Sequence, residues 1–163
     1  MERTIQRVQP VRKAVRKQLY TAAYVRVSCE KDAMRKSLYA QMDYYQKYIR
    51  QHEDWIFAGI YADEFYSGTK DDRPRFQQML KDCMSGKINR IITKSISRFA
   101  RNTVTLLTVV RTLRDKGIGV YFEEQNIDTL SGSGELLLTL LASQAQEESR
   151  MASENCKWRI RRM

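Results

Sequence analysis

Short apolar runs and stretches of helical periodicity alternate along most of the chain. Apolar runs bounded by polar residues are typical of buried strands, and they occur at 20–28, 55–63, 88–94 and 118–125. Between them, apolar residues recur at helical spacing, which predicts helices over 37–51, from Pro74 through Leu80, and over 102–117. From Gly134 onward, one long helical pattern begins apolar and becomes charged.

Strands that alternate with helices predict an α/β fold. We expect a mainly parallel sheet with helices on both faces, followed by a long C-terminal helix. In such sheets, sites form at the carboxyl ends of the strands, which selects the loops that begin at Ser28, Asp63 and Lys94. The expected organisation is a basic leader over 1–19, a core over 20–133 and a long helix over 134–163.

The composition excludes several classes of protein. Cys29, Cys83 and Cys156 show no C-x-x-C spacing, which argues against a disulfide framework or zinc site and favours a reducing compartment. His52 is the only histidine, so Ser-His hydrolase chemistry lacks an obvious base. No apolar run reaches the length of a membrane span. We therefore expect a cytoplasmic protein without a membrane partner.

The net charge of +10 is concentrated at the two ends of the chain. Residues 1–18 contain six Lys/Arg and one Glu, and residues 150–163 contain five Lys/Arg and one Glu, which leaves +1 for the body between them. Basic ends on a nearly neutral body predict a polyanionic partner, and nucleic acid in particular. For the N-terminal end alone, a solubilising tail explains the charge equally well.

The first predicted strand carries an arginine and a hydroxyl at its end. Arg26 and Ser28 are two residues apart, so their side chains share a face of the strand. An arginine inside an otherwise apolar strand is costly unless it meets an anion. The simplest alternative is an ion pair between Arg26 and a loop carboxylate such as Asp63.

The stretch "KSISRFARN" carries three cations in eight residues. Arg98 and Arg101 are three apart, so in the first turn of a helix they point the same way. Cations there oppose the helix dipole, which indicates a strongly negative ligand such as phosphate. Lys94 and Arg73 lie in loops at the same predicted edge. A solvated basic turn is the alternative explanation.

Together these loops predict a serine hydroxyl surrounded by arginines. Such an arrangement suits attack on a phosphodiester, because guanidinium groups stabilise the charge of the pentacoordinate transition state without a metal ion. Five segments in this order, "YVRVS", "YSGTKDDRPRF", "KSISRFARN", "NIDTL" and "GELLLTLLASQAQEESR", resemble the serine recombinases of the resolvase/invertase superfamily. The likeness is to the catalytic domain of the large serine recombinases of phages and mobile elements.

The resemblance implies roles for individual residues. Ser28 corresponds to the nucleophile that forms a 5′-phosphoserine link to DNA. Four arginines correspond to active-site positions, namely Arg26, Arg73, Arg98 and Arg101. Three further positions correspond to supporting polar residues, namely Gln41, Asp63 and Ser67, and Lys94 is a supporting cation. Ser97 departs from the small resolvases, which often carry an acidic residue there, and "DEFYSG" is one residue longer than in those relatives.

The family's chemistry and assembly are implied in the same way. The resemblance implies no metal and no other cofactor, DNA as partner, and a homo-oligomer that is a dimer and, in the synaptic complex, a tetramer. Strands are exchanged by rotation of one half of that tetramer against the other. The long terminal helix is expected to pair subunits and to lead to a DNA-binding region, which makes this chain the N-terminal catalytic part of a longer recombinase.

Three alternatives compete with this interpretation. Cys29 and Arg35 have the C-x5-R spacing of a cysteine phosphatase loop, although Cys156 and Arg162 repeat that spacing. A metal-dependent nuclease would use carboxylates from the second loop, namely Asp63, Glu64, Asp71 or Asp72. The third alternative is a DNA-binding assembly module without activity.

Overall fold

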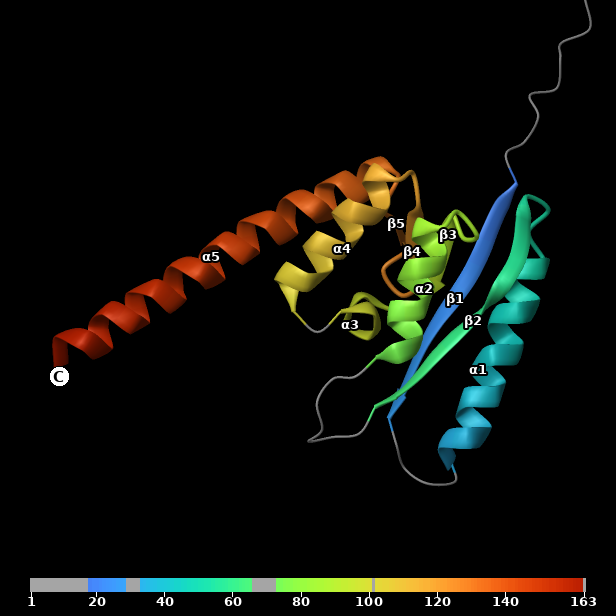
Figure 1. Cartoon of the computed structure of the whole chain (residues 1–163), viewed down its shortest axis with the longest axis horizontal. Helices are drawn as coiled ribbons and strands as arrows, with labels where there is room; N and C mark the ends of the chain where they lie inside the picture. The colour runs from blue at the N-terminus through green and yellow to red at the C-terminus, as the bar shows by residue number, and fades with distance from the viewer. Residues whose placement is uncertain (1–17, 29–32, 66–72, 101, 163) are drawn as a thin grey trace, which may run out of the picture.

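A computed structural model describes residues 18–28, 33–65, 73–100 and 102–162 (Figure 1). Its elements, in chain order, are β1 (Leu19–Ser28), α1 (Ala33–Arg50), β2 (Trp55–Phe65), α2 (Pro74–Met84), β3 (Arg90–Thr93), α3 (Ile96–Phe99), α4 (Thr103–Asp115), β4 (Gly119–Phe122), β5 (Ile127–Asp128) and α5 (Gly132–Arg162). The C-terminal part of α5 extends away from the sheet (Figure 1).

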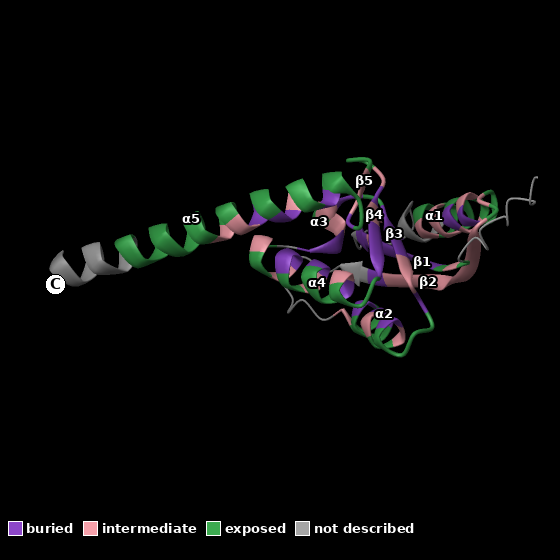
Figure 2. Cartoon of the chain, turned by 90° about the horizontal axis from the view of Figure 1, so that it is seen from above, coloured by how far each residue is buried: buried purple, intermediate pink, exposed green. Residues whose placement is uncertain are grey.

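The five strands form one sheet in the order β2-β1-β3-β4-β5. The pairings from β2 to β4 are parallel, and only β5 is antiparallel. Helix α1 covers one face, while α2 and α4 lie on the other (Figure 2). The predicted α/β fold, with a mainly parallel sheet, helices on both faces and a long final helix, is confirmed.

A hydrophobic core lies on each face of the sheet, and alternating side chains of β1 contribute to both. Ala23, Val25 and Val27 pack with Tyr45 and Ile49 of α1 on one face. Ala22 and Tyr24 belong to the larger core on the opposite face, which α2, α4 and the start of α5 cover. Successive residues of a strand point to opposite faces, so Arg26 belongs to the Tyr24 face, beyond the apolar part of that core.

Several boundaries differ from the sequence predictions. Helix α1 begins at Ala33 rather than at residue 37, and α5 begins at Gly132 rather than at Gly134. The strand predicted over 118–125 ends at Phe122, followed by a turn. The pattern did not predict β5 or α3, because elements of two and four residues are too short to show a period.

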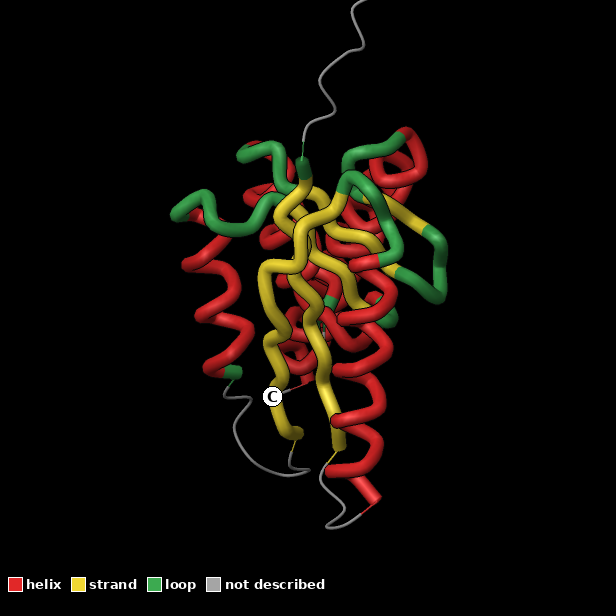
Figure 3. The backbone as a smooth tube through the Cα atoms, turned by 90° about the vertical axis from the view of Figure 1, so that its right-hand side faces the viewer, coloured by secondary structure: helices red, strands yellow, loops and turns green. Residues whose placement is uncertain are grey.

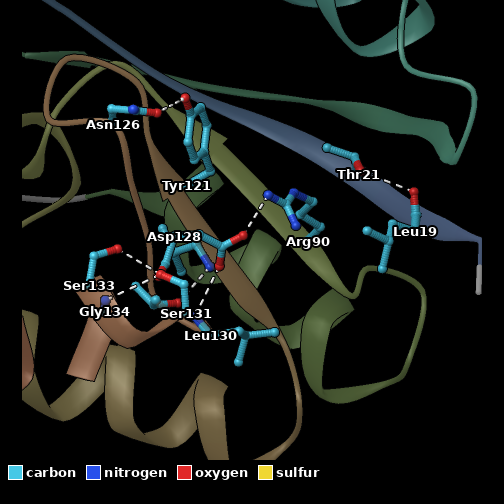
Figure 4. Close-up of polar contacts among 12 residues, drawn as sticks. Leu19, Thr21, Arg90, Tyr121, Asn126, Asp128, Leu130, Ser131, Ser133 and Gly134 are labelled. Carbon is cyan, nitrogen blue, oxygen red and sulfur yellow. Dashed lines mark hydrogen bonds and ion pairs between the residues drawn. The ribbon is translucent and has the colours of Figure 1, made fainter.

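The "NIDTL" segment forms the junction between the sheet and α5 (Figure 4). Arg90 of β3 donates to Asp128 Oδ2 at 2.7 Å, and the backbone N–H of Leu130 donates to Asp128 Oδ1 at 2.9 Å. The Ser131 hydroxyl donates to the Asp128 carbonyl at 2.6 Å. The buried Thr129 accepts a hydrogen bond from the backbone N–H of Val120 at 2.8 Å. These contacts set the point from which α5 departs.

Gly134 permits the close approach of α5 to this junction. A Cβ at position 134 would lie 2.5 Å from the Asp128 carbonyl oxygen and from two backbone atoms of Thr129. Gly134→Ala is therefore expected to lower the free energy of unfolding by about 1–3 kcal/mol, because the backbone has to shift. Urea unfolding measures this change.

Gly132→Ala is the matched control, because a Cβ there meets nothing within 4 Å. Alanine also has the higher helix propensity, so this variant is expected to be as stable as the wild type or slightly more stable. Equal stability of the two variants would contradict the importance of the close approach.

Candidate functional site

The carboxyl ends of β1 and β2 lie at the same edge of the sheet, where the chain leaves toward α1 and α2 (Figure 3). Strand β1 pairs with β3 only over Thr21–Tyr24, so its last residues run past β3 and pair with β2 alone. In that register Arg26 is opposite Asp63 and Ser28 is opposite Phe65. Backbone placement therefore puts the predicted nucleophile at this edge. The Ser28 side chain lies outside the described part of the structure, as do Cys29, Ser67, Arg101 and the Arg35 side chain.

Helix α3 occupies the space beside β1 that β3 leaves open. Its anchor is Phe99, which is fully buried and makes edge-to-face contacts with Tyr24, Phe76 and Phe122 at ring-centre distances of 6.3, 5.2 and 5.7 Å. Aromatic pairs favour this geometry. A four-residue helix is not stable on its own, so the packing of Phe99 in this aromatic cluster determines where α3 lies.

Two predicted active-site arginines bind the backbone of α3. Arg26 donates to the Ser97 carbonyl at 3.0 Å, and Arg73 donates to the Phe99 carbonyl at 2.7 Å. Arg73 also lies over the Phe76 ring, with its guanidinium carbon 4.3 Å from the ring centre. Carbonyls at the end of a helix have no partner within the helix, so the guanidinium groups satisfy them. Arg26, Arg73 and α3 are thereby held at one edge of the sheet.

Asp63 has a structural role at the start of α2. It is 3% exposed, and its carboxylate accepts hydrogen bonds from the backbone N–H of Arg75 at 3.0 Å and of Phe76 at 2.9 Å. The Tyr24 hydroxyl donates to the same carboxylate at 3.2 Å, and burial together with Asp63 raises the pKa of Tyr24. Asp63 thus caps a helix whose own N-cap residue, Arg73, provides no capping side chain.

The prediction that Arg98 and Arg101 share the first turn of one helix is wrong, because α3 ends at Phe99. Arg98 lies in α3, and Ala100 is extended (φ −139°, ψ 152°), so the chain leaves helical geometry before α4 begins at Thr103. Asn102 caps α4 by accepting from the backbone N–H of Thr105 at 2.7 Å. The helix-dipole argument therefore does not apply to Arg98. Its half-buried side chain makes no hydrogen bond or ion pair within the described residues.

Lys94 and Gln41 lie on the other side of this edge, toward α1. Both line a cavity of about 390 Å³ together with Tyr44, Tyr45 and Glu123. Lys94 forms an ion pair with the neighbouring Glu124 at 3.7 Å, with both side chains about half exposed. Among the described residues, Gln41 and Lys94 therefore line a different cavity from the one that Arg26 lines.

A groove of about 610 Å³ on the opposite side contains Arg26 and extends to α5. Sequence reasoning missed several polar residues that line it, namely Asn102, Gln125, Gln144 and Glu148. Thr103 donates to Glu148 at 3.4 Å across this groove. Gln144 and Glu148 are four residues apart on α5, and that helical spacing was the available signal.

The guanidinium groups at this edge of the sheet suit an anionic ligand. Among the residues that the structure describes, no group of three His, Cys, Asp or Glu side chains could hold a metal. Burial raises the pKa of the Cys83 thiol to about 12, so this thiol is protonated and unreactive at neutral pH. Guanidinium groups beside a strand that ends in serine are suited to a phosphate.

In the described chain, no helix is long and apolar enough to cross a membrane.

The same fold occurs in site-specific recombinases. A resolvase family site-specific recombinase from Streptococcus pneumoniae aligns with a TM-score of 0.71 and 26% identity, covering 88% of this chain and 99% of that chain. The N-terminal catalytic domain of TP901-1 integrase aligns with a TM-score of 0.59 and 24% identity, over 81% of this chain and 98% of that chain. The fold is that of serine recombinase catalytic domains.

A family model described as "Resolvase, N terminal domain" matches residues 21–163. The chain belongs to the resolvase family, which confirms the resemblance seen in its motifs. Transposon Tn552 DNA-invertase BinR of Staphylococcus aureus is 32% identical over 97 residues, which cover 58% of this chain and 49% of that protein. The chain spans about half the length of the curated relatives it matches.

Proposed function

We propose that this chain is the catalytic domain of a site-specific DNA recombinase in which Ser28 is the nucleophile. The observation that carries the proposal is the pair of arginine contacts with α3. Arg26, two residues before Ser28, and Arg73 both bind α3 carbonyls, which holds α3 and its Arg98 at the strand edge where β1 ends.

The proposed reaction is a transfer of the phosphoryl group from DNA to serine. The Ser28 oxygen attacks the scissile phosphorus, the bond from phosphorus to the 3′ oxygen breaks, and the serine proton is delivered to that oxygen, which leaves as a 3′-hydroxyl. The product is a 5′-phosphoserine link that conserves the energy of the phosphodiester. Attack by a 3′-hydroxyl on this link reverses the step, rejoins the DNA and restores the serine hydroxyl.

The proposed roles of the charged residues follow from their contacts. Arg26, Arg98 and Arg101 stabilise the charge that develops on the phosphate oxygens, since guanidinium forks match phosphate geometry. Arg73 and Asp63 position this group, because Asp63 caps the helix that Arg73 begins. The solvent-exposed Lys94–Glu124 pair is weak, which leaves Lys94 available to a phosphate of the DNA backbone.

Gln41 and Ser67 complete the proposed supporting residues.

DNA is the proposed substrate and partner, and a homodimer that forms a tetramer at synapsis is the proposed assembly. Strand exchange would then occur by rotation of one half of the tetramer. Leu136, Leu140 and Met151 support subunit pairing through α5, because these apolar side chains are 61%, 59% and 58% exposed.

The proposed organisation is a basic leader over 1–19, a catalytic core over 20–133 and, over 134–163, a helix for pairing and for connection to a DNA-binding region. The test is to trap the full-length recombinase on gapped DNA that carries its recombination site. Protease digestion and mass spectrometry then identify the residue bound to the 5′ phosphate. We expect Ser28, and a link to another residue would refute the mechanism.

A further inference from the structure

One carboxylate joins α1 to the end of β4, far away in the sequence. Glu123 accepts hydrogen bonds from the hydroxyl groups of Tyr44 and Tyr45, the latter at 3.0 Å. The interaction raises the pKa of Tyr44 to about 12, and burial together with Glu123 also raises the pKa of Tyr45. Both tyrosines are therefore protonated at neutral pH and act as donors.

The hydrogen bonds from Tyr44 and Tyr45 to Glu123 lie where the first fully buried of the described side chains of α1 packs against the sheet. From residue 37 onward, Tyr45 is the first fully buried residue of the helix, at 2% exposure, and Ile49 is the second. Residues 37–44 are exposed or only half-buried. Fully buried side chains therefore hold α1 from Tyr45 onward, whereas among residues 37–44 the partly buried Leu38 packs against that core.

Glu123 is itself held firmly. Although β4 ends at Phe122, the backbone N–H of Glu123 donates to the Thr93 carbonyl at 3.0 Å, and that of Glu124 donates to the Lys94 carbonyl at 2.8 Å. The carboxylate therefore projects from backbone that continues the pairing of β3 with β4. A rigidly held acceptor for two hydroxyl groups determines the position of the helix that carries them.

We propose that Glu123 is a positioning residue that orients the N-terminal half of α1 over the edge of the sheet where DNA is cleaved. The inference rests on the function proposed above. Gln41 is one helical turn before Tyr45 and lines the same cavity as Lys94, so the bonds to Glu123 determine where both supporting residues lie relative to each other. Ala33, where α1 begins, is five residues after Ser28.

The first test compares Glu123→Gln with Asp43→Asn in the full-length recombinase on gapped site DNA. Glu123→Gln is expected to lower the cleavage rate at saturating DNA by about 10- to 100-fold, because small displacements of catalytic groups have effects of this size. The DNA concentration at half-maximal cleavage should stay within about twofold. Asp43→Asn removes a carboxylate from an exposed pair with Lys47 on the same helix, and is expected to cleave at the wild-type rate.

The second test measures the anchoring without relying on cleavage. Glu123→Gln should accelerate amide hydrogen exchange in the N-terminal half of α1 and leave β1 and β3 protected. Tyr44→Phe, at a residue that is 46% exposed, should do the same more weakly in a protein that folds normally. On the cleavage rate, Tyr45→Phe combined with Glu123→Gln should be no slower than the slower single variant, since both remove one interaction.

Three results would overturn the inference. They are cleavage by Glu123→Gln at the rate of Asp43→Asn, uniform acceleration of exchange across the sheet, and additive effects of the Tyr45 and Glu123 variants. A link of DNA to a residue other than Ser28 would instead refute the proposed function, and the exchange measurement would still decide whether Glu123 anchors α1.

Discussion

Replacing Ser28 by alanine is expected to abolish covalent capture of DNA by the full-length recombinase. The rate of strand cleavage should fall by on the order of 10⁴-fold or more, as when other enzymes lose their nucleophile. The physical reason is that the substitution removes the oxygen that is proposed to attack the phosphorus. Binding to DNA should change little, because the guanidinium groups that attract the phosphates remain. A gel assay for the protein–DNA link measures capture, and a salt titration measures binding.

Cys29→Ala is the control that separates the two neighbouring nucleophiles. We expect it to capture DNA at close to the wild-type rate. The reverse pattern, in which Ser28→Ala is active and Cys29→Ala is not, would favour the phosphatase-like alternative with Cys29 and Arg35. Addition of EDTA should leave cleavage unchanged, whereas loss of cleavage would favour the metal-dependent alternative that uses carboxylates among Asp63, Glu64, Asp71 and Asp72.

Asp63→Ala is expected to lower the free energy of unfolding by about 2–4 kcal/mol. The substitution leaves the buried Tyr24 hydroxyl and the first backbone N–H groups of α2 without their acceptor, and each unsatisfied buried donor costs about 1–3 kcal/mol. Arg73 at the start of α2 would lose its fixed position, so cleavage should also slow. Urea unfolding of the chain measures the stability change.

Asp63→Asn provides the comparison, because its amide oxygen can still accept from the start of α2. We expect this variant to lose about half as much stability as Asp63→Ala. If Asp63→Ala unfolds at the same urea concentration as the wild type, the capping role of Asp63 is wrong. If only cleavage falls, Asp63 acts in the chemistry and not in positioning.

The order of strands and helices was predictable because each long element carries its own period. The apolar run of β1 and the helical spacing of α1 and α4 are local signals, because burial selects apolar residues at those positions. Family membership was also predictable, since five short motifs appear in order at their expected spacing. Local periodicity did not reveal α3, and for that reason the prediction that Arg98 and Arg101 share the first turn of one helix was wrong.

The sequence by itself therefore determined the α/β class, the mainly parallel sheet and the family, and it predicted a site at one edge of that sheet. Only the tertiary structure decided what the side chains at that edge contact. Arg26 and Ser97 are 71 residues apart, and Tyr45 and Glu123 are 78 apart. Such pairs leave no periodic signal, because their contact exists only after β1, β3 and β4 have paired. In the folded sheet Asp63 caps α2, and Glu123 accepts hydrogen bonds from Tyr44 and Tyr45 of α1.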